Sequence, residues 1–260
     1  MQTHIHTEAD LDHGLAALAQ ADPRFVALVA KGGRPPLRRR PGGFAGLAAI
    51  IVSQQLSTAS AAAIWGRLAA AFDPLDAAAI LRARPARLAR LGLSGAKIRT
   101  LKAIAHAVAR EGLVLESLAD LPADDAHAAL TTLHGIGPWT ADIYLLGCLG
   151  HADAWPAGDL ALQEAARLAF ALPARPTTKQ MHVLAEPWRP WRAVAARILW
   201  TYYRAVKGRE GAPVTPTKPA AGKTKPDVSK PGASKPTATK PTATKSNQTK
   251  TGKRRGQNGR

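Results

Sequence analysis

The stretch LHGIGP at residues 133–138 constrains this chain more than any other. Its two glycines, one residue apart, allow backbone conformations that other residues avoid, and proline fits the first position of a helix, where its missing N–H costs nothing. Residues 126–133 before this turn are helical in character, and apolar residues repeat at helical spacing after it, at Trp139, Ile143, Leu146 and Leu149. The pattern predicts two helices joined by a glycine hairpin, whose free N–H groups can hold a phosphate.

A second turn, PAGD at residues 156–159, precedes another helical pattern over residues 160–170. Asp159 therefore stands at the start of a helix. A carboxylate at this place is either an N-cap, which accepts hydrogen bonds from backbone N–H groups, or a catalytic group held at a helix end. This segment alone leaves both interpretations open.

Strand signals are almost absent before residue 208, where alanine and leucine dominate. Helix starts are predicted from capping residues at Thr7 with Asp10, Asp73 with Asp76, Ser94, and Thr177 with Gln180, and from Pro190 for the last helix. The loop at residues 32–43 is rich in proline, glycine and arginine and marks a subdomain boundary. We therefore predict an all-α protein of about ten helices.

The chain carries 36 Lys and Arg against 18 Asp and Glu, a formal net charge of +18. Residues 208–260 hold 13 of the basic residues and two acidic ones, which gives +11 and leaves +7 for residues 1–207. This tail is rich in Lys, Pro, Thr and Ala and nearly lacks large apolar residues, so we predict that it is disordered. It is either a solubilising extension or an arm that binds nucleic acid through its phosphates.

The single cysteine, Cys148, excludes a disulfide framework and a four-cysteine metal cluster, and its apolar surroundings predict a small core residue. The eight histidines show no metal-ligand spacing with carboxylates, so we expect no catalytic metal and no required cofactor. No apolar run has the length of a membrane span, and the N-terminus lacks the pattern of a secretory signal. We expect a cytoplasmic protein without a membrane partner.

Four blocks resemble a known family when they are read in order: IVSQQLS at 51–57, LHGIGPWTADIYLL at 133–146, GD at 158–159 and WRPWR at 188–192. They resemble the helix-hairpin-helix/GPD superfamily of DNA glycosylases, and within it the alkylbase branch of 3-methyladenine glycosylases. The resemblance covers roughly residues 8–206. It implies a two-lobed helical bundle, with lobe one at about 44–130 and lobe two formed by about 1–43 with 131–207. It also implies a monomer that acts on double-stranded DNA.

The resemblance implies base-excision repair, in which an alkylated base such as 3-methyladenine or 7-methylguanine is flipped out of the duplex and its N-glycosidic bond is hydrolysed. Asp159 would be the catalytic carboxylate that stabilises the oxocarbenium-like sugar and orients or deprotonates the attacking water. Asp142 and Asp153 are weaker alternatives. Trp139 stands where glycosylases that also cleave the backbone carry a Schiff-base lysine, so the resemblance implies a monofunctional enzyme without lyase activity.

By the same resemblance, Trp139 and Trp200 line the base pocket, where an indole face attracts a cationic alkylated base. The position of a family pocket tyrosine is Ile143 here, with Tyr144 one residue later, and Leu160 replaces a second pocket tyrosine. A core position is the alternative interpretation of Trp139. The two departures leave the range of substrates open.

Gln55 matches the residue that enters the gap in the duplex when a base is flipped out, and Leu56 is its substitute. The alternative is a polar helix end that caps backbone groups. The hairpin would contact DNA through His134, Gly135, Ile136, Gly137 and Thr140. The resemblance also implies that the carbonyls of Thr131, Leu133 and Gly135 bind a structural Na⁺ or K⁺.

Two other functions remain open. A monofunctional glycosylase for uracil, hypoxanthine or mismatched thymine would use the same hairpin and Asp159. A non-catalytic hairpin protein would only bind DNA, but binding needs neither Asp159 nor Trp139, which argues against this third function.

Overall fold

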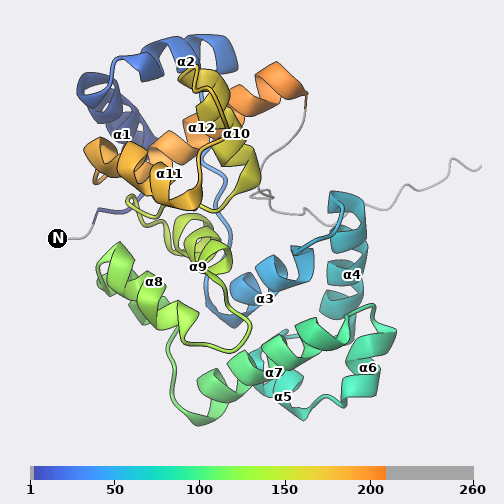
Figure 1. Ribbon diagram of the computed structural model, residues 1–260. Coiled ribbons are helices and arrows are strands. Elements are labelled where there is room, and N and C mark those ends of the chain that lie inside the picture. Colours follow the sequence, from blue (N-terminus) through green and yellow to red (C-terminus); the bar gives the residue numbers. More distant parts are fainter. Residues whose placement is uncertain (1–2, 209–260) are drawn as a thin grey trace, which may run out of the picture. The chain divides into compact units, whose positions relative to one another are not determined.

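The computed structural model describes residues 3–208 (Figure 1). Its α-helices are α1 (Glu8–Ala21), α2 (Arg24–Gly32), α3 (Gly43–Ser53), α4 (Thr58–Ala71), α5 (Ala77–Arg82), α6 (Pro85–Arg90), α7 (Gly95–Arg110), α8 (Ala123–Thr131), α9 (Pro138–Tyr144), α10 (Leu160–Ala169), α11 (Thr178–Ala185) and α12 (Arg192–Lys207). Three short helical segments join them, the 3₁₀ helices η1 (Glu116–Asp120) and η3 (Glu186–Trp188) and the π-helix η2 (Leu145–Leu149). Over the described residues the only β pairing is one bridge between His4 and His151, which confirms the all-α prediction. Except for Gly208, which ends α12, the predicted basic tail lies outside the described residues.

Four of the twelve described α-helices start at a predicted capping site, and at the predicted site of Asp73 with Asp76 it is Asp76 that caps the helix. Thr7 and Thr177 each form a capping box, while Asp76 and Ser94 accept from the third N–H of their helices.

The last helix, however, does not begin at Pro190. Trp191 has non-helical angles (φ −106°, ψ 23°), and its N–H donates to the Trp188 carbonyl at 2.7 Å. Because of this turn, α12 begins at Arg192. The described residues also hold more helices than predicted, in part because Pro85 forces Arg84 into an extended conformation and separates α5 from α6.

The described helices pack in two groups, with α9 between them in Figure 1. In one group α12 packs against α1, α2 and α10; in the other α3 packs against α4 and α7, and α5 against α7. The chain passes between the groups through residues 33–42, inside the loop that the sequence predicts at residues 32–43. The described residues belong to one compact unit, so the predicted lobe boundaries at about 44 and 131 stay a prediction.

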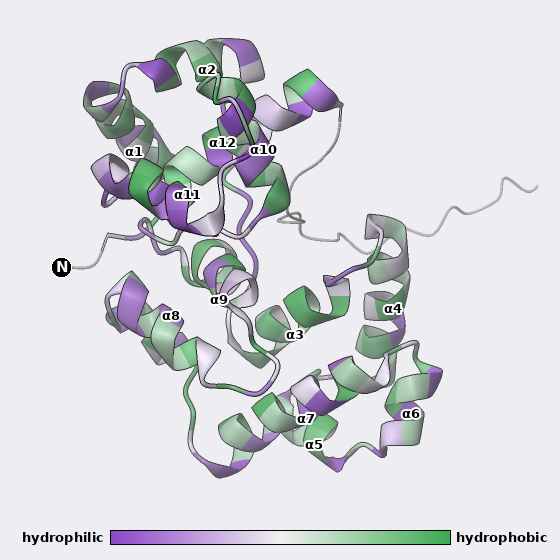
Figure 2. Cartoon of the chain, viewed as in Figure 1, coloured by the Kyte–Doolittle hydropathy of each residue, from purple (hydrophilic) through white to green (hydrophobic). Residues whose placement is uncertain are grey.

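Helix α3 anchors the core at the centre of the molecule. Eight of its eleven residues are buried, and Figure 2 shows it almost wholly in hydrophobic colours. Cys148 is also buried, as predicted, and its burial raises the pKa of its thiol to about 12. Within residues 3–208, no helix combines the length and the apolar character that crossing a bilayer requires.

Candidate active site

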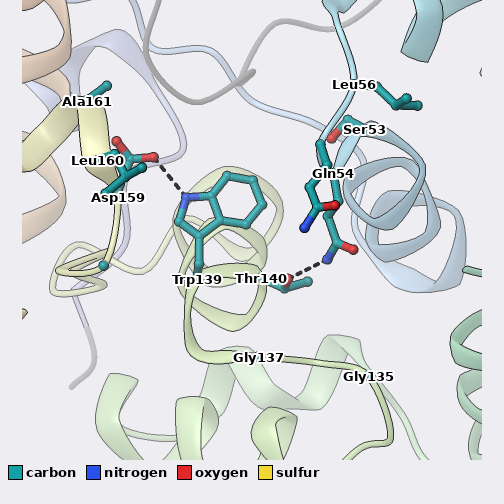
Figure 3. Close-up of a pocket in the computed structure, with 12 residues that line it drawn as sticks. Ser53, Gln54, Leu56, Gly135, Gly137, Trp139, Thr140, Asp159, Leu160 and Ala161 are labelled. Atoms are coloured by element: carbon teal, nitrogen blue, oxygen red, sulfur yellow. Dashed lines mark hydrogen bonds between the residues drawn. The ribbon is translucent and has the colours of Figure 1, made fainter. Parts of the chain in front are cut away.

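A cavity of about 600 Å³ lies where the ends of three helices meet (Figure 3). The end of α3 and the loop after it contribute residues 53–56, and the hairpin with the first turn of α9 contributes Gly135, Gly137, Trp139 and Thr140. The start of α10 contributes residues 158–161. Three segments far apart in the sequence thus bring the predicted wedge, hairpin and carboxylate to one cavity.

Asp159 is both the N-cap of α10 and a wall of this cavity. Its Oδ1 accepts from the Leu162 N–H at 2.8 Å and from Trp200 Nε1 at 3.1 Å. Its Oδ2 accepts from Trp139 Nε1 at 2.8 Å. Because Oδ1 takes the bonds that hold the helix start, Oδ2 is the oxygen that chemistry in the cavity can use. The two interpretations of Asp159 are therefore compatible.

Trp139 lies on the first turn of α9, directly after Pro138 at the N1 position. Its ring stands between Asp159 and Gln54 in the view of Figure 3, and the side chain is half-buried. The hydrogen bond to Asp159 fixes the ring by its edge. Trp139 is the only aromatic residue among those that line the cavity, so its indole face is the surface on which a planar cation can stack.

We call the loop after α3, residues 54–57, the wedge loop, after the predicted wedge residues Gln55 and Leu56. It is held from two sides. Lys97 Nζ donates to the carbonyls of Val52 and Gln54, each at 2.8 Å, and Gln54 Nε2 donates to Thr140 Oγ1 at 2.7 Å. Gln55 has a left-handed φ of +55°. The side chains of Gln55 and Leu56 are exposed at the cavity. The start of the loop is therefore held in place, while these two side chains remain accessible.

The structure confirms the helix-hairpin-helix and distinguishes its two glycines. Gly135 has φ +80°, and a Cβ there would lie 2.0 Å from Thr100 Oγ1. Gly137 is the N-cap of α9 with φ −89°, and a Cβ there would meet nothing within 4 Å. The prediction that both glycines are needed for backbone freedom is thus right for Gly135 and wrong for Gly137. The protein itself gives no reason for a glycine at position 137.

The remaining hairpin residues have different exposures. His134 is exposed, whereas Ile136 is buried. Thr140 is also buried, but its hydroxyl accepts the bond from Gln54 and its atoms line the cavity.

Of the other residues predicted for the base pocket, only Leu160 lines this cavity, and it is 64% exposed. Ile143 and Tyr144 are buried in the hydrophobic core and are not among the lining residues. They follow Trp139 by four and five positions, on the part of α9 that continues into the buried π-helix. Trp200 is also absent from the lining and reaches the site through its bond to Asp159.

The two alternative carboxylates are engaged elsewhere. Asp142 is buried on α9, 3.8 Å from His127 Nε2, and burial raises the pKa of its carboxyl well above the usual range. Asp153 pairs with Arg189 and Arg192. Among the cavity-lining residues, Asp159 is the only acidic one.

The family model described as "HhH-GPD superfamily base excision DNA repair protein" matches residues 48–190, which include the wedge loop, the hairpin and Asp159. The chain belongs to this superfamily. The match covers more than half of the chain, and its limits enclose every cavity-lining segment.

Relatives of this HhH-GPD protein have been found in bacteria and yeast. It is 36% identical over 207 residues to a Mycobacterium tuberculosis protein named "Probable bifunctional transcriptional activator/DNA repair enzyme AlkA", covering 74% of this chain but only 40% of that protein's length. It is 28% identical to the DNA-3-methyladenine glycosylase of Bacillus subtilis, covering 76% of this chain and 70% of the relative. The solved Schizosaccharomyces pombe 3-methyladenine DNA glycosylase in complex with abasic DNA superposes with a TM-score of 0.62 at 25% identity, covering 74% and 95% of the two chains.

Sequence reasoning missed three residues of this HhH-GPD site: Gln54, Lys97 and Thr100. Each acts through a contact more than thirty residues away along the chain, to Thr140, to the end of α3 and to Gly135, respectively. The predicted start of α7 at Ser94 was the available signal, since it places Lys97 and Thr100 on the first turns of that helix.

Proposed function

We propose that the protein excises alkylated bases, of the 3-methyladenine and 7-methylguanine type, from double-stranded DNA and leaves an abasic site. One observation carries this proposal: Asp159, Trp139 and the loop with Gln55 share a single cavity beside the hairpin. Support comes from the B. subtilis relative, named a DNA-3-methyladenine glycosylase, and from the S. pombe enzyme, solved with abasic DNA.

The chemistry of the cavity suits a cationic base. Alkylation at N3 or N7 gives a purine a positive charge, so it stacks on Trp139 and leaves readily with the electrons of the glycosidic bond. Asp159 Oδ2 stabilises the positive charge that develops on the sugar. Water then adds to the anomeric carbon and gives up its proton to the carboxylate or to solvent. The lining offers no strong proton donor, and a cationic leaving group requires none.

The protein holds the duplex through the hairpin and the wedge loop. The first N–H groups of α9 have no partner within the helix, and the open space at Gly137 lets a phosphate approach them. Gln55, with Leu56 beside it, fills the gap left by the flipped base. A single copy of the chain contains all these parts, so we propose a monomer.

The hairpin also fits the monovalent cation that the family resemblance implies. Thr131 ends α8, where carbonyls have no partner within the helix. Leu133 accepts one bond, from the Ile136 N–H, and keeps a free lone pair, and the left-handed Gly135 turns the chain. We propose that these three carbonyls hold Na⁺ or K⁺, which would steady the hairpin.

A base-release assay tests the proposal. Duplexes that carry 3-methyladenine, 7-methylguanine, hypoxanthine or uracil are incubated with the protein, and the released base is identified. We expect release of the alkylated bases. Release of only uracil or hypoxanthine would favour the alternative glycosylase, and tight binding without any release would favour a DNA-binding protein.

The product is expected to be an intact abasic strand. Trp139 stands where a lyase would need a lysine, and none of the residues that line the cavity is a lysine. After base release, gel analysis without alkali should show an unbroken strand, and borohydride should trap almost no protein. A covalent adduct in good yield would contradict the monofunctional assignment.

Lys97→Met should impair excision more than it impairs folding. The substitution keeps the apolar stem but leaves the Val52 carbonyl of α3 and the Gln54 carbonyl of the wedge loop without this donor, at a stability cost of about 1–3 kcal/mol. Lys102→Met is the matched control, because Lys102 Nζ binds the carbonyls of Leu81 and Ala83, neither of which lines the cavity. Both variants should lose similar stability in urea, and only Lys97→Met should slow single-turnover excision at saturating enzyme. Equal rates would show that the anchor does not position the wedge.

A further inference from the structure

A second cavity, of about 380 Å³, lies at the junction of α5 and α6. Arg82, Arg84, Arg87 and Arg90 line it together with two alanines, and no acidic residue is among them. All four arginines are exposed. The catalytic cavity shares no residue with this site.

Within residues 3–208, none of the four arginines pairs with an acidic side chain. Arg82, Arg84 and Arg90 form no ion pair or side-chain hydrogen bond with the rest of residues 3–208. Arg87 is fixed, since it donates to the Ala71 carbonyl at 2.8 Å and lies over the Phe72 ring at 4.5 Å. Lys102 adds a fifth cation, because its ammonium binds the carbonyls of Leu81 and Ala83 at the edge of the site. Two cations, Arg87 and Lys102, are thus positioned in advance, and the other three arginines line the same cavity.

The charge of the folded part is concentrated in the same region. Residues 58–110 carry nine Lys and Arg against two Asp, a net charge of +7. Residues 1–207 together carry 23 basic and 16 acidic residues, so this region accounts for their whole excess of positive charge. Local repulsion of this kind is relieved by a polyanion.

Helix α7 connects this cavity to the wedge loop. Lys97, on its first turn, binds the loop, and Lys102, which borders the arginine cavity, follows five residues later, a rise of about 7.5 Å. Duplex DNA carries one phosphate charge per about 1.7 Å of its axis. The backbone that flanks a base held at the wedge is the polyanion that the proposed function brings to this part of the protein.

We propose that the arginine cavity binds the phosphate backbone of duplex DNA beside the lesion, independently of sequence and damage. Guanidinium groups match phosphate oxygens in pairs, and the lining holds no aromatic residue on which an unpaired base could stack. This second contact rests on the proposed function only in that DNA is the partner. Base release itself does not require it.

The test compares full-length Arg84→Gln/Arg90→Gln with Arg110→Gln/Arg175→Gln, which removes the same charge from exposed positions outside the cavity. Binding to an undamaged duplex is measured over a range of KCl concentrations. Each lost phosphate contact flattens the log–log slope by about 0.9, so we expect a change of about 1.8 for the cavity variant and little for the control. Single-turnover excision at saturating enzyme should be the same for all three proteins.

The other outcomes overturn the proposal. Equal slopes for the cavity variant and the wild type would show that no phosphate of DNA binds there, and an equal change in the control would show a general charge effect. Binding of inorganic tripolyphosphate that only the cavity variant loses, with an unchanged DNA slope, would assign the cavity to a small polyphosphate. Because the duplex is undamaged, the slopes remain readable even if no base is ever released, which separates this inference from the proposed function.

Discussion

Replacing Asp159 with asparagine is expected to lower the single-turnover rate of base release by about 10²–10³-fold, the usual loss when one group that stabilises a transition-state charge is removed. Asparagine keeps an oxygen that accepts from the Leu162 N–H, so the start of α10 is preserved, while its amide nitrogen faces Trp139 Nε1 and the hydrogen bond to that ring is lost. The hairpin and the wedge loop are untouched, and affinity for lesion DNA should be retained. The rate and the affinity are measured on the same duplex.

Asp142→Asn is the matched control for this substitution. Asp142 also lies on the hairpin helix, but burial raises the pKa of its carboxyl, so asparagine replaces a group that favours the neutral form. We expect a rate close to that of the wild type. A normal rate for Asp159→Asn, or an equal loss in both variants, would remove Asp159 from the chemistry.

The elements of the fold were predictable because their signals are local. A capping box such as Thr7 with Asp10, or a proline after a glycine turn as at Pro138, determines where a helix starts through contacts a few residues away. The same holds for the hairpin itself. The predicted start of the last helix at Pro190 was wrong. The turn between Trp188 and Trp191 decides this start, and helix propensity does not predict that turn.

The placement of Asp159 at a helix start was predictable from the sequence and is seen in the structure, whereas its catalytic role comes from the family resemblance and stays a prediction. The periphery of the site was harder. Ile143 and Tyr144 were expected in the base pocket because they stand near a family position, but packing of α9 into the core buries them away from the cavity. The anchors of the wedge loop depend on where α7 packs, which the sequence of α7 does not specify.

Replacing each of the two hairpin glycines with alanine is expected to change a different property, namely stability at Gly135 and DNA affinity at Gly137. At Gly135 an alanine must adopt φ +80°, and its Cβ would lie 2.0 Å from Thr100 Oγ1. Left-handed strain and overpacking each cost about 1–3 kcal/mol, so the unfolding temperature should drop by about 5–15 °C. The variant Gly135→Ala/Thr100→Ala removes the overlap but not the strain and should recover part of the loss.

At Gly137 an alanine meets open space and keeps an ordinary φ, so its stability should match that of the wild type. Its methyl group instead occupies the space through which a phosphate would reach the N–H groups of α9. Affinity for DNA should therefore fall by about tenfold or more, the equivalent of roughly 1.4 kcal/mol of steric cost. Thermal unfolding and DNA binding are measured on both variants. Neither the backbone angles nor the packing of the described residues requires a glycine at position 137. Normal DNA affinity in Gly137→Ala would therefore mean that the hairpin does not hold the DNA backbone.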